Sequence, residues 1–426
     1  MKKLTSILLL LLFVWTVQAQ TAREEIRANR YLSANNYYAY PTPTAKQTAA
    51  PKGYEPFYIS TYMRHGSRYL IDPNDYRFPK QTLLKADSLN KLTATGKNTL
   101  DIVLRMADMA EGRLGELTSV GARQHRGIAK RMYTNFPQIF ADGTEVDARS
   151  TVVIRCILSM TSECLQLQAI NPNLCIKNDA SYHDMYYMNY DDTLLFKKRM
   201  PTSAMVPYTE FCKNHEHPER VMRLLFNDDD YWKNHLNADK LYEVLFKQAS
   251  NVQSTELRKS MSLYDLFTDD EIYDLWQINN AWWYINYGAC PLNGGKQPYS
   301  QRNLLRKIIS DADSCIALPH PGATLRYGHD TMVMPLTCLM DLDGMGMQVS
   351  DLEQLAYKGW NNYRIFPMAC NIQLVFYHKK GSKDILVKVL RNENEATLPI
   401  KTDIAPYYHW KDVRQYYLDK LNKFME

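Results

Sequence analysis

The sequence predicts an α/β fold interrupted by a helical insertion, and three observations support it. Residues 56–63 (PFYISTYM) form a strand-length run of aromatic and β-branched residues that ends abruptly in the polar loop RHGSR at 64–68. Apolar residues then recur with helical spacing, most clearly over 119–135. Between 168 and 299, tyrosine, tryptophan, asparagine and charged residues replace any buried-strand pattern. We therefore predict an α/β core in two parts, 20–167 and 300–426, separated by a helical cap over 168–299.

The composition is that of an ordinary globular protein. The chain has 426 residues, 45% of them hydrophobic, with 51 Lys+Arg against 46 Asp+Glu and a formal charge of +5. At about 100 to 200 residues per domain, this length suggests two or three structural units. Collagen, coiled coil and wholesale disorder are excluded. The positive surplus is too small and too dispersed for a nucleic-acid-binding face, although a local basic pocket for an anion stays open.

The first 19 residues have the pattern of a cleavable signal peptide. Two lysines precede an apolar run over 7–17, and the small-residue pattern VQA follows at 17–19. The apolar run is shorter than the ~20 residues that a membrane span needs, and no later stretch reaches that length. We therefore expect an exported protein, periplasmic or secreted, without a membrane span.

Export changes how the eight cysteines are interpreted, because an oxidising compartment permits disulfides. Their pairing cannot be deduced from the sequence, and burial of several as small hydrophobic residues is an equal alternative. If 151–168 is a helix, Cys156 and Cys164 lie roughly 12 Å apart, too far for a bridge. No cysteine or histidine cluster has the spacing of a zinc site, and we expect no metal and no cofactor.

The same periodicities predict the remaining elements of the chain. Residues 21–31 form a possible short helix in a lead-in that wraps over the fold. The other predicted elements are helices at 79–89, 96–111, 119–135 and 301–317, strands at 145–149 and 323–328, a helix that carries Arg155, and a hairpin of 371–378 with 384–391. Strands that run into polar loops and helices are the pattern of an α/β core.

The loop at 64–68 concentrates two guanidinium groups around an imidazole. Guanidinium forks match the oxygens of a phosphate and stay charged, so Arg64 and Arg68 can hold a phosphoryl group. His65 can then attack phosphorus, and Gly66 lets backbone and ligand approach closely. A salt-bridged surface turn is the alternative interpretation.

Two further clusters strengthen the hypothesis of a phosphate site. Arg149 and Arg155 flank a predicted strand-to-helix junction, where backbone N–H groups and the helix dipole favour anions. His329 and Asp330 follow another predicted strand, and an aspartic acid beside an anion can protonate a leaving alkoxide. Because the carboxyl ends of such strands meet at one edge of a sheet, the three clusters predict a single site.

Five segments, in this order along the chain, resemble the histidine acid phosphatases. This branch of the histidine phosphatase superfamily includes prostatic-type acid phosphatase, phytases and multiple inositol polyphosphate phosphatase. The segments are YMRHGSRYL at 62–70, LTSVGARQHRGIAKRMY at 117–133, ARSTVVIRCILSM at 148–160, LRYGHDTMVMPL at 325–336 and ACNIQLVFYHKK at 369–380. The resemblance implies a phosphoglycerate mutase-like three-layer core with a mostly parallel sheet, plus an inserted helical cap.

The resemblance also implies roles for individual residues. His65 would be the nucleophile that forms a phosphohistidine, and Asp330 would protonate the leaving group. The phosphate ligands would be Arg64, Arg68, Arg155 and His329, with Arg149 and Ser67 as supporting residues. No metal is implied, because the arginines supply the positive charge that a cation supplies in other phosphatases.

The sequence departs from the family in two places. Leu70 stands where the usual motif has proline. Ser67 and Tyr69 resemble the inositol polyphosphate phosphatases, whereas His329 and Asp330 resemble acid phosphatases and many phytases rather than the His-Ala-Glu of that subfamily. The sequence therefore indicates the proton donor but not the substrate.

The cap carries its densest basic cluster at Lys197, Lys198 and Arg199. If this cluster faces the cleft, it would favour a polyanion such as phytate; a solvated basic turn is the alternative. The leading hypothesis is an exported phosphatase of phosphate monoesters that is active on the acidic side, with inositol polyphosphates as the expected substrates. The alternatives are a broad-specificity acid phosphatase, a phosphoglycerate mutase-like phosphotransferase and a non-catalytic inositol phosphate-binding protein. The expected partner is a small phosphate ester and not nucleic acid, and the oligomeric state stays open.

Overall fold

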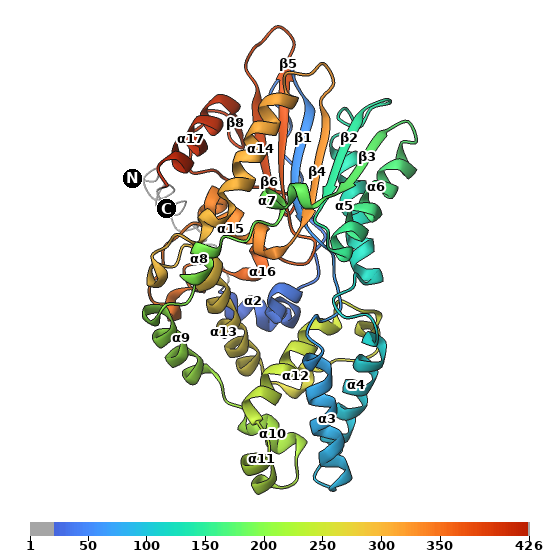
Figure 1. Cartoon of the computed structure of the whole chain (residues 1–426), viewed down its shortest axis with the longest axis vertical. Helices are drawn as coiled ribbons and strands as arrows, with labels where there is room; N and C mark the ends of the chain where they lie inside the picture. The colour runs from blue at the N-terminus through green and yellow to red at the C-terminus, as the bar shows by residue number, and fades with distance from the viewer. Residues whose placement is uncertain (1–20, 425–426) are drawn as a thin grey trace, which may run out of the picture.

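The computed structural model describes residues 21–424 and has an upper lobe built on one sheet and a lower lobe of helices (Figure 1). The expected signal peptide, 1–19, lies outside the described residues. The strands are β1 (Tyr54–Arg64), β2 (Glu145–Ser150), β3 (Cys175–Ala180), β4 (Gly322–Gly328), β5 (Asn371–Lys379), β6 (Leu386–Arg391), β7 (Asn394–Glu395) and β8 (Tyr407–His409).

The sheet is mixed, with parallel strands at its centre. Its order is β3-β2-β4-β1-β5-β6-β7, and β8 also pairs with β6. The pairs β3–β2, β2–β4 and β4–β1 are parallel, whereas the pairs from β1–β5 onward are antiparallel. The predicted α/β class is confirmed, and β5 and β6 form the predicted hairpin. The parallel strands place the carboxyl ends of β1, β2 and β4 at one edge.

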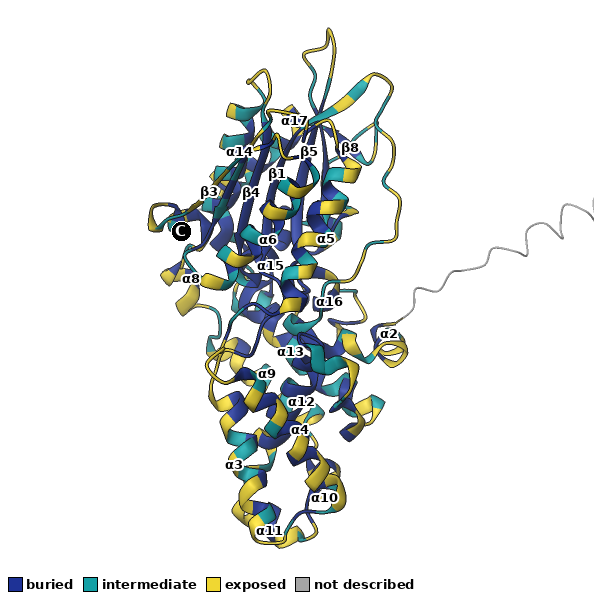
Figure 2. Cartoon of the chain, turned by 90° about the vertical axis from the view of Figure 1, so that its right-hand side faces the viewer, coloured by how far each residue is buried: buried dark blue, intermediate teal, exposed yellow. Residues whose placement is uncertain are grey.

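Helices cover both faces of this sheet and make the core three-layered. On one face lie α5 (Ser119–Asn135) and α6 (Ile154–Ile170), on the other α14 (Arg302–Cys315), α15 (Asp330–Met340) and α17 (Trp410–Asn422) (Figures 1 and 2). Side chains of β1 alternate between the two layers, as a pleated strand requires. Ile59 and Met63 pack with α5 and α6, whereas Tyr58 and Tyr62 pack with α14 and α15.

The lower lobe has a hydrophobic core of its own. Its helices are α3 (Asn74–Ser88), α4 (Ala94–Ala110), α9 (Thr202–His215), α10 (Glu219–Leu225), α11 (Asp229–His235), α12 (Ala238–Val252) and α13 (Asp269–Tyr287). The lead-in contributes α2 (Ala22–Ala28) and the 3-10 helix η1 (Arg30–Tyr37), and η1 packs against α12 and α13. The short helices α7 (Met185–Met188), α8 (Thr193–Lys197) and α16 (Asn362–Ile365) complete the α-helices of residues 21–424.

The predicted boundaries of the cap differ from the structure in two ways. Residues 168–299 are not wholly helical, because β3 lies within them and pairs with β2. This edge strand, CIKNDA, is mostly exposed and lacks the apolar run by which a buried strand is recognised. Conversely, α3 and α4 precede residue 168 but pack against α12 and α10 of the helical lobe. The lobe is therefore assembled from both sides of the predicted boundary.

All eight cysteines lie among the described residues as free thiols, and five of them are buried. Cys156 and Cys164 both lie on α6, as the argument against their pairing assumed. Over residues 21–424 the structure contains no helix with the length and apolar character needed to cross a membrane.

Candidate functional site

The two central parallel strands bring the RHG loop and the His-Asp pair together. Arg64 is the last residue of β1 and lies beside Gly328, the last residue of β4. The backbone N–H of His65 donates to the carbonyl of Gly328 at 2.9 Å. His329 caps α15, and Asp330 is the first residue of that helix. The rings of His65 and His329 consequently lie 5.8 Å apart, centroid to centroid.

The imidazole of His65 is buried in a defined tautomer. Its Nδ1 lies 2.9 Å from the carbonyl oxygen of Gly66. Because a carbonyl only accepts, Nδ1 carries the proton and Nε2 keeps a free lone pair. Burial, and then the charges of Arg64, Arg155 and Arg68, hold the pKa of His65 well below 6.5. The ring is therefore neutral and nucleophilic in mildly acidic solution.

Three arginines surround this imidazole. Arg64 is fully buried, and its Nη1 donates to the carbonyl of Phe366 at 3.0 Å. Arg68 donates from Nη1 to the carbonyl of Tyr69 at 3.0 Å. Burial, and then the charge of Arg68, lower the pKa of Arg155.

The Nε atoms of all three guanidinium groups are buried without an acceptor among the described residues. Buried donors of this kind require a partner, and the oxygens of a tetrahedral anion can supply it.

Asp330 shares the site with these cations. Its Oδ2 lies 2.7 Å from Nη2 of Arg64 and accepts from Nδ2 of Asn36 at 3.3 Å. Burial raises the pKa of Asp330, but Arg64 and Arg68 outweigh burial, and the pKa lies below its usual value. In the ligand-free protein this carboxyl group is therefore ionised.

His329 stands on the β2 side of the site. Its Nε2 lies 3.3 Å from the hydroxyl of Thr151, which directly follows β2. Burial, and then the charge of Arg155, lower the pKa of His329 to about 4. The imidazole is therefore neutral at mildly acidic pH and can donate one N–H to a bound anion.

Ser67 and Arg149, the predicted supporting residues, make contacts within the protein. The buried hydroxyl of Ser67 accepts from Nε2 of Gln124 at 3.0 Å. The guanidinium of Arg149 binds Asp147 at 3.1 Å and Asp184 at 2.9 Å. These carboxylates balance the charge of Arg149, which thereby links β2 to the segment after β3. The predicted supporting role of Arg149 at the site stays a prediction.

The structure separates the basic cluster of the cap. Lys197 and Lys198 are exposed. The guanidinium of Arg199, by contrast, lies 4.2 Å from the ring centroid of Tyr287. Burial raises the pKa of this phenol, Arg199 lowers it and the nearby Asp330 raises it further. Tyr287 is therefore in contact with Arg199 and near enough to Asp330 for the carboxylate to affect its pKa.

The sequence analysis missed two residues of the lead-in. Asn36 donates to Asp330, and the guanidinium of Arg68 lies 5.3 Å from the ring centroid of Tyr37. Both come from η1, whose sequence RYLSANNY has little periodicity. No local signal marks them, because only the packing of η1 against α12 and α13 brings them to the site.

Comparisons with known proteins agree with this geometry. The family described as "Histidine phosphatase superfamily (branch 2)" matches residues 59–392 of the chain. The chain is 22% identical to multiple inositol polyphosphate phosphatase 1 of Gallus gallus over 396 residues, covering 88% of this chain and 85% of that protein.

Solved structures show the same fold. The multiple inositol polyphosphate phosphatase of Bifidobacterium longum, in complex with inositol hexasulfate, is similar with a TM-score of 0.69 and 17% identity, covering 90% of this chain and 97% of that one. The phytase of D. castellii is similar with a TM-score of 0.64 and 14% identity, covering 96% and 89%. The chain belongs to branch 2 of the histidine phosphatase superfamily, the histidine acid phosphatases, and is a phosphomonoesterase.

Proposed function

We propose that this phosphomonoesterase is exported and hydrolyses inositol polyphosphates through a covalent phosphohistidine at His65. The observation that carries the mechanism is the hydrogen bond from Nδ1 of His65 to the carbonyl of Gly66, because it leaves Nε2 as the nucleophile among three arginines. The substrate class is supported by the relatives, which are named as inositol polyphosphate phosphatases and phytases.

In the first step, the arginines and His329 bind the phosphate oxygens, and Nε2 of His65 attacks phosphorus. The bond between phosphorus and the leaving oxygen breaks, and Asp330 gives its proton to that oxygen. In the second step, Asp330 takes a proton from water, the water attacks phosphorus, and inorganic phosphate leaves a free His65. The proton that Asp330 loses in the first step is regained in the second.

Asp330 must carry a proton to act as the acid, yet the arginines keep it ionised in the ligand-free site. A bound phosphate dianion offsets the field of those arginines and so raises the pKa of Asp330. Substrate binding thereby prepares the acid for its task, and activity is expected on the acidic side of neutrality.

Trapping the intermediate tests the mechanism. Wild-type protein, mixed with ³²P-labelled phytate and quenched without acid, should yield a labelled phosphoprotein. His65→Ala should yield none, and Asp330→Asn should form it slowly or accumulate it. The assay covers pH 4 to pH 7, a range around the ~pH 6 ionisation of phosphate esters. If the wild type shows no turnover in this range, the proposal is overturned.

We further propose that Arg199 contributes to the preference for a polyanionic substrate, since Tyr287 links it to the site. Arg199→Ala should lower the ratio of phytate hydrolysis to p-nitrophenyl phosphate hydrolysis. A Lys197→Ala/Lys198→Ala variant tests the exposed pair, and Lys213→Ala on α9 is the control. An unchanged ratio in Arg199→Ala contradicts the role of Arg199.

One observation favours a second candidate, a broad-specificity acid phosphatase. Asn36 and Tyr37 also line a cavity of about 360 Å³ in the helical lobe. The other lining residues include four aromatic residues, two carboxylates and one lysine: Tyr208, Phe246, Trp282, Trp283, Glu216, Glu243 and Lys247. Such walls suit an aromatic leaving group better than a polyanion. A panel of phytate, aryl and sugar phosphates decides between the two candidates by their kcat/KM values.

Export rests on the expected signal peptide at 1–19. Expression of the full chain in a host that secretes proteins should give a processed product that begins at Gln20. A product that keeps residues 1–19 in the cytoplasm contradicts export.

A further inference from the structure

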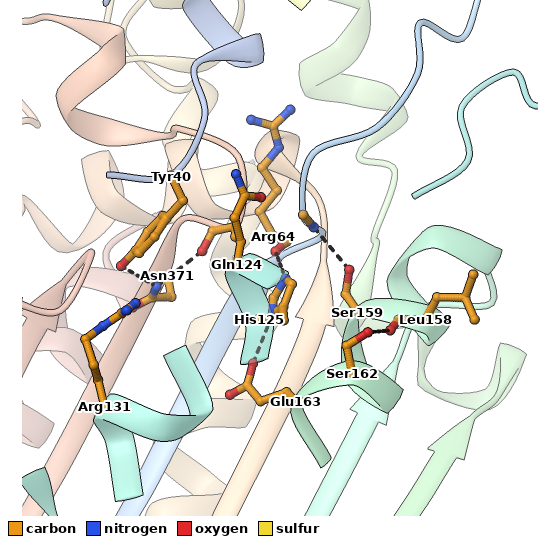
Figure 3. Close-up of polar contacts among 12 residues, drawn as sticks. Tyr40, Arg64, Gln124, His125, Arg131, Leu158, Ser159, Ser162, Glu163 and Asn371 are labelled. Carbon is orange, nitrogen blue, oxygen red and sulfur yellow. Dashed lines mark hydrogen bonds and ion pairs between the residues drawn. The ribbon is translucent and has the colours of Figure 1, made fainter. Parts of the chain in front are cut away.

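The loop that carries His65 lies directly on helix α5. A Cβ atom added to Gly66 would lie 2.5 Å from the carbonyl oxygen of Gly121, near the start of that helix. The backbones of the loop and the helix are therefore in direct contact. This contact brings side chains of α5 and α6 within hydrogen-bonding distance of the loop (Figure 3).

The peptide unit between Gly66 and Ser67 is held on both sides. Its carbonyl accepts the hydrogen bond from Nδ1 of His65 at 2.9 Å, and its N–H donates to Oε1 of Gln124 at 2.8 Å. Gln124 also donates from Nε2 to the hydroxyl of Ser67 at 3.0 Å. Because a peptide unit is planar, fixing its N–H fixes the direction of its carbonyl. Gln124 thus orients the carbonyl that sets the tautomer of His65.

The peptide unit before His65 has separate anchors. Nε2 of His125 lies 3.1 Å from the carbonyl oxygen of Arg64, and Nδ1 lies 2.9 Å from Oε2 of Glu163 (Figure 3). The side chains of His125 and Glu163 are fully buried. Since the carbonyl only accepts, Nε2 of His125 donates, and this peptide unit cannot turn without breaking that bond.

The peptide unit after His65 is held as well. Its carbonyl accepts from the N–H of Ala369 at 3.0 Å, and its N–H donates to the hydroxyl of Ser159 at 3.1 Å. The Gly66–Ser67 unit is the next one, and glycine on its N-terminal side tolerates a reversal of the peptide plane. A reversed unit would turn the N–H of Ser67 toward Nδ1 of His65, which would then accept and leave the proton on Nε2.

We propose that Gln124 is a positioning residue that prevents this reversal and so keeps Nε2 of His65 unprotonated. The proposal rests on the proposed role of His65 as nucleophile. The phosphate-binding arginines have other anchors, Phe366 for Arg64 and Tyr69 for Arg68. Loss of the Gln124 contact therefore acts on the nucleophile rather than on phosphate binding.

The test compares Gln124→Met, which removes the acceptor, with Gln124→Glu, which keeps one, and with Lys130→Met, an exposed control on the same helix. Release of p-nitrophenol is followed in single turnovers with enzyme in excess, and inorganic phosphate is measured as a competitive inhibitor. Gln124→Met should slow the single turnover about 10- to 100-fold, because a small misplacement of a reacting group has this cost. The inhibition constant of phosphate should change less than about threefold, and Gln124→Glu should restore most of the rate.

Three results would overturn the proposal. The first is a wild-type rate in Gln124→Met. The second is phosphate binding weakened as much as the rate, which would place Gln124 in the phosphate site. The third is a loss in Gln124→Glu equal to that in Gln124→Met, which would show that the acceptor is irrelevant. A wild-type protein without any turnover is a different outcome, because it refutes the proposed function itself.

Discussion

Substituting Gly66 by alanine tests whether the close contact between loop and helix positions His65, the proposed nucleophile. The added Cβ would lie 2.5 Å from the carbonyl oxygen of Gly121 and 2.6 Å from its Cα. Both partners are backbone atoms, so no flexible side chain can move aside. The loop that carries His65 and the start of α5 must therefore separate.

The size of the displacement follows from the contact distances. Restoring an ordinary van der Waals separation of 3.4 Å requires a shift of about 0.9 Å. A misplacement of about 1 Å at a reacting group costs on the order of 100-fold in rate, which corresponds to ~2.7 kcal/mol of transition-state stabilisation. Gly66→Ala should accordingly lower kcat/KM for p-nitrophenyl phosphate about 100-fold while the protein stays folded.

Two further variants make this test specific. Gly121→Ala places a Cβ against the backbone of Ser67 and should reproduce the loss from the helix side. In Gly127→Ala, on the same helix, the nearest atom is the flexible end of Arg131 at 3.1 Å, and activity should be unchanged. If Gly66→Ala keeps its activity within about threefold of wild type, the contact does not position the nucleophile.

Three other predictions concern protons at the site. The lowered pKa of His329, about 4, means that between pH 7 and pH 5 only the unfolded chain takes up a proton at this imidazole. In urea denaturation, the free energy of unfolding should therefore fall about 2 kcal/mol more in the wild type than in His329→Asn between pH 7 and pH 5. An equal fall in the two proteins contradicts the lowered pKa. In single turnovers with enzyme in excess, Asp330→Asn should slow release of an alkyl alcohol about 10²- to 10⁴-fold and release of p-nitrophenol much less, because nitrophenolate leaves without a proton. Equal losses in this first step would exclude a role as acid. Sulfate, which does not titrate near pH 5, should bind with proton uptake in calorimetry across several buffers, and this uptake should shrink in Asp330→Asn.

The sequence predicted the centre of the fold better than its periphery. The buried strand β1 carries a run of aromatic and β-branched residues, and in β4 the apolar Ala323, Leu325 and Tyr327 alternate with polar residues. The ends of both strands could therefore be located and the polar loops that follow them assigned to one edge. The strand β3 has no such run, because it lies at the edge of the sheet beside β2 and most of its residues are exposed. Apolar runs reveal a strand only where its side chains are buried, so an exposed strand is missed.

The same distinction holds for the site residues. Arg64 ends β1, and His65, His329 and Asp330 come just after β1 and β4, so strand pairing alone brings these residues together. Asn36 and Gln124 reach the site from elements that are distant along the chain, through packing that no local pattern encodes. Gln124 and His125 lie in one of the five segments that resemble the family, but the resemblance assigned them no role.

The charges of the site fit a phosphate dianion in number as well as in place. Three guanidinium groups, one ionised carboxylate and two imidazoles held neutral by lowered pKa values give the ligand-free site a formal charge of +2. A dianionic phosphate ester brings −2 and reduces the formal charge that acts on Asp330 from +3 to +1, so that this carboxyl group takes up a proton more readily when the substrate binds. Were either imidazole protonated, the site would keep a positive surplus, and Asp330 would hold its proton less readily. The lowered pKa values of His65 and His329 are therefore as necessary for the acid as for the nucleophile.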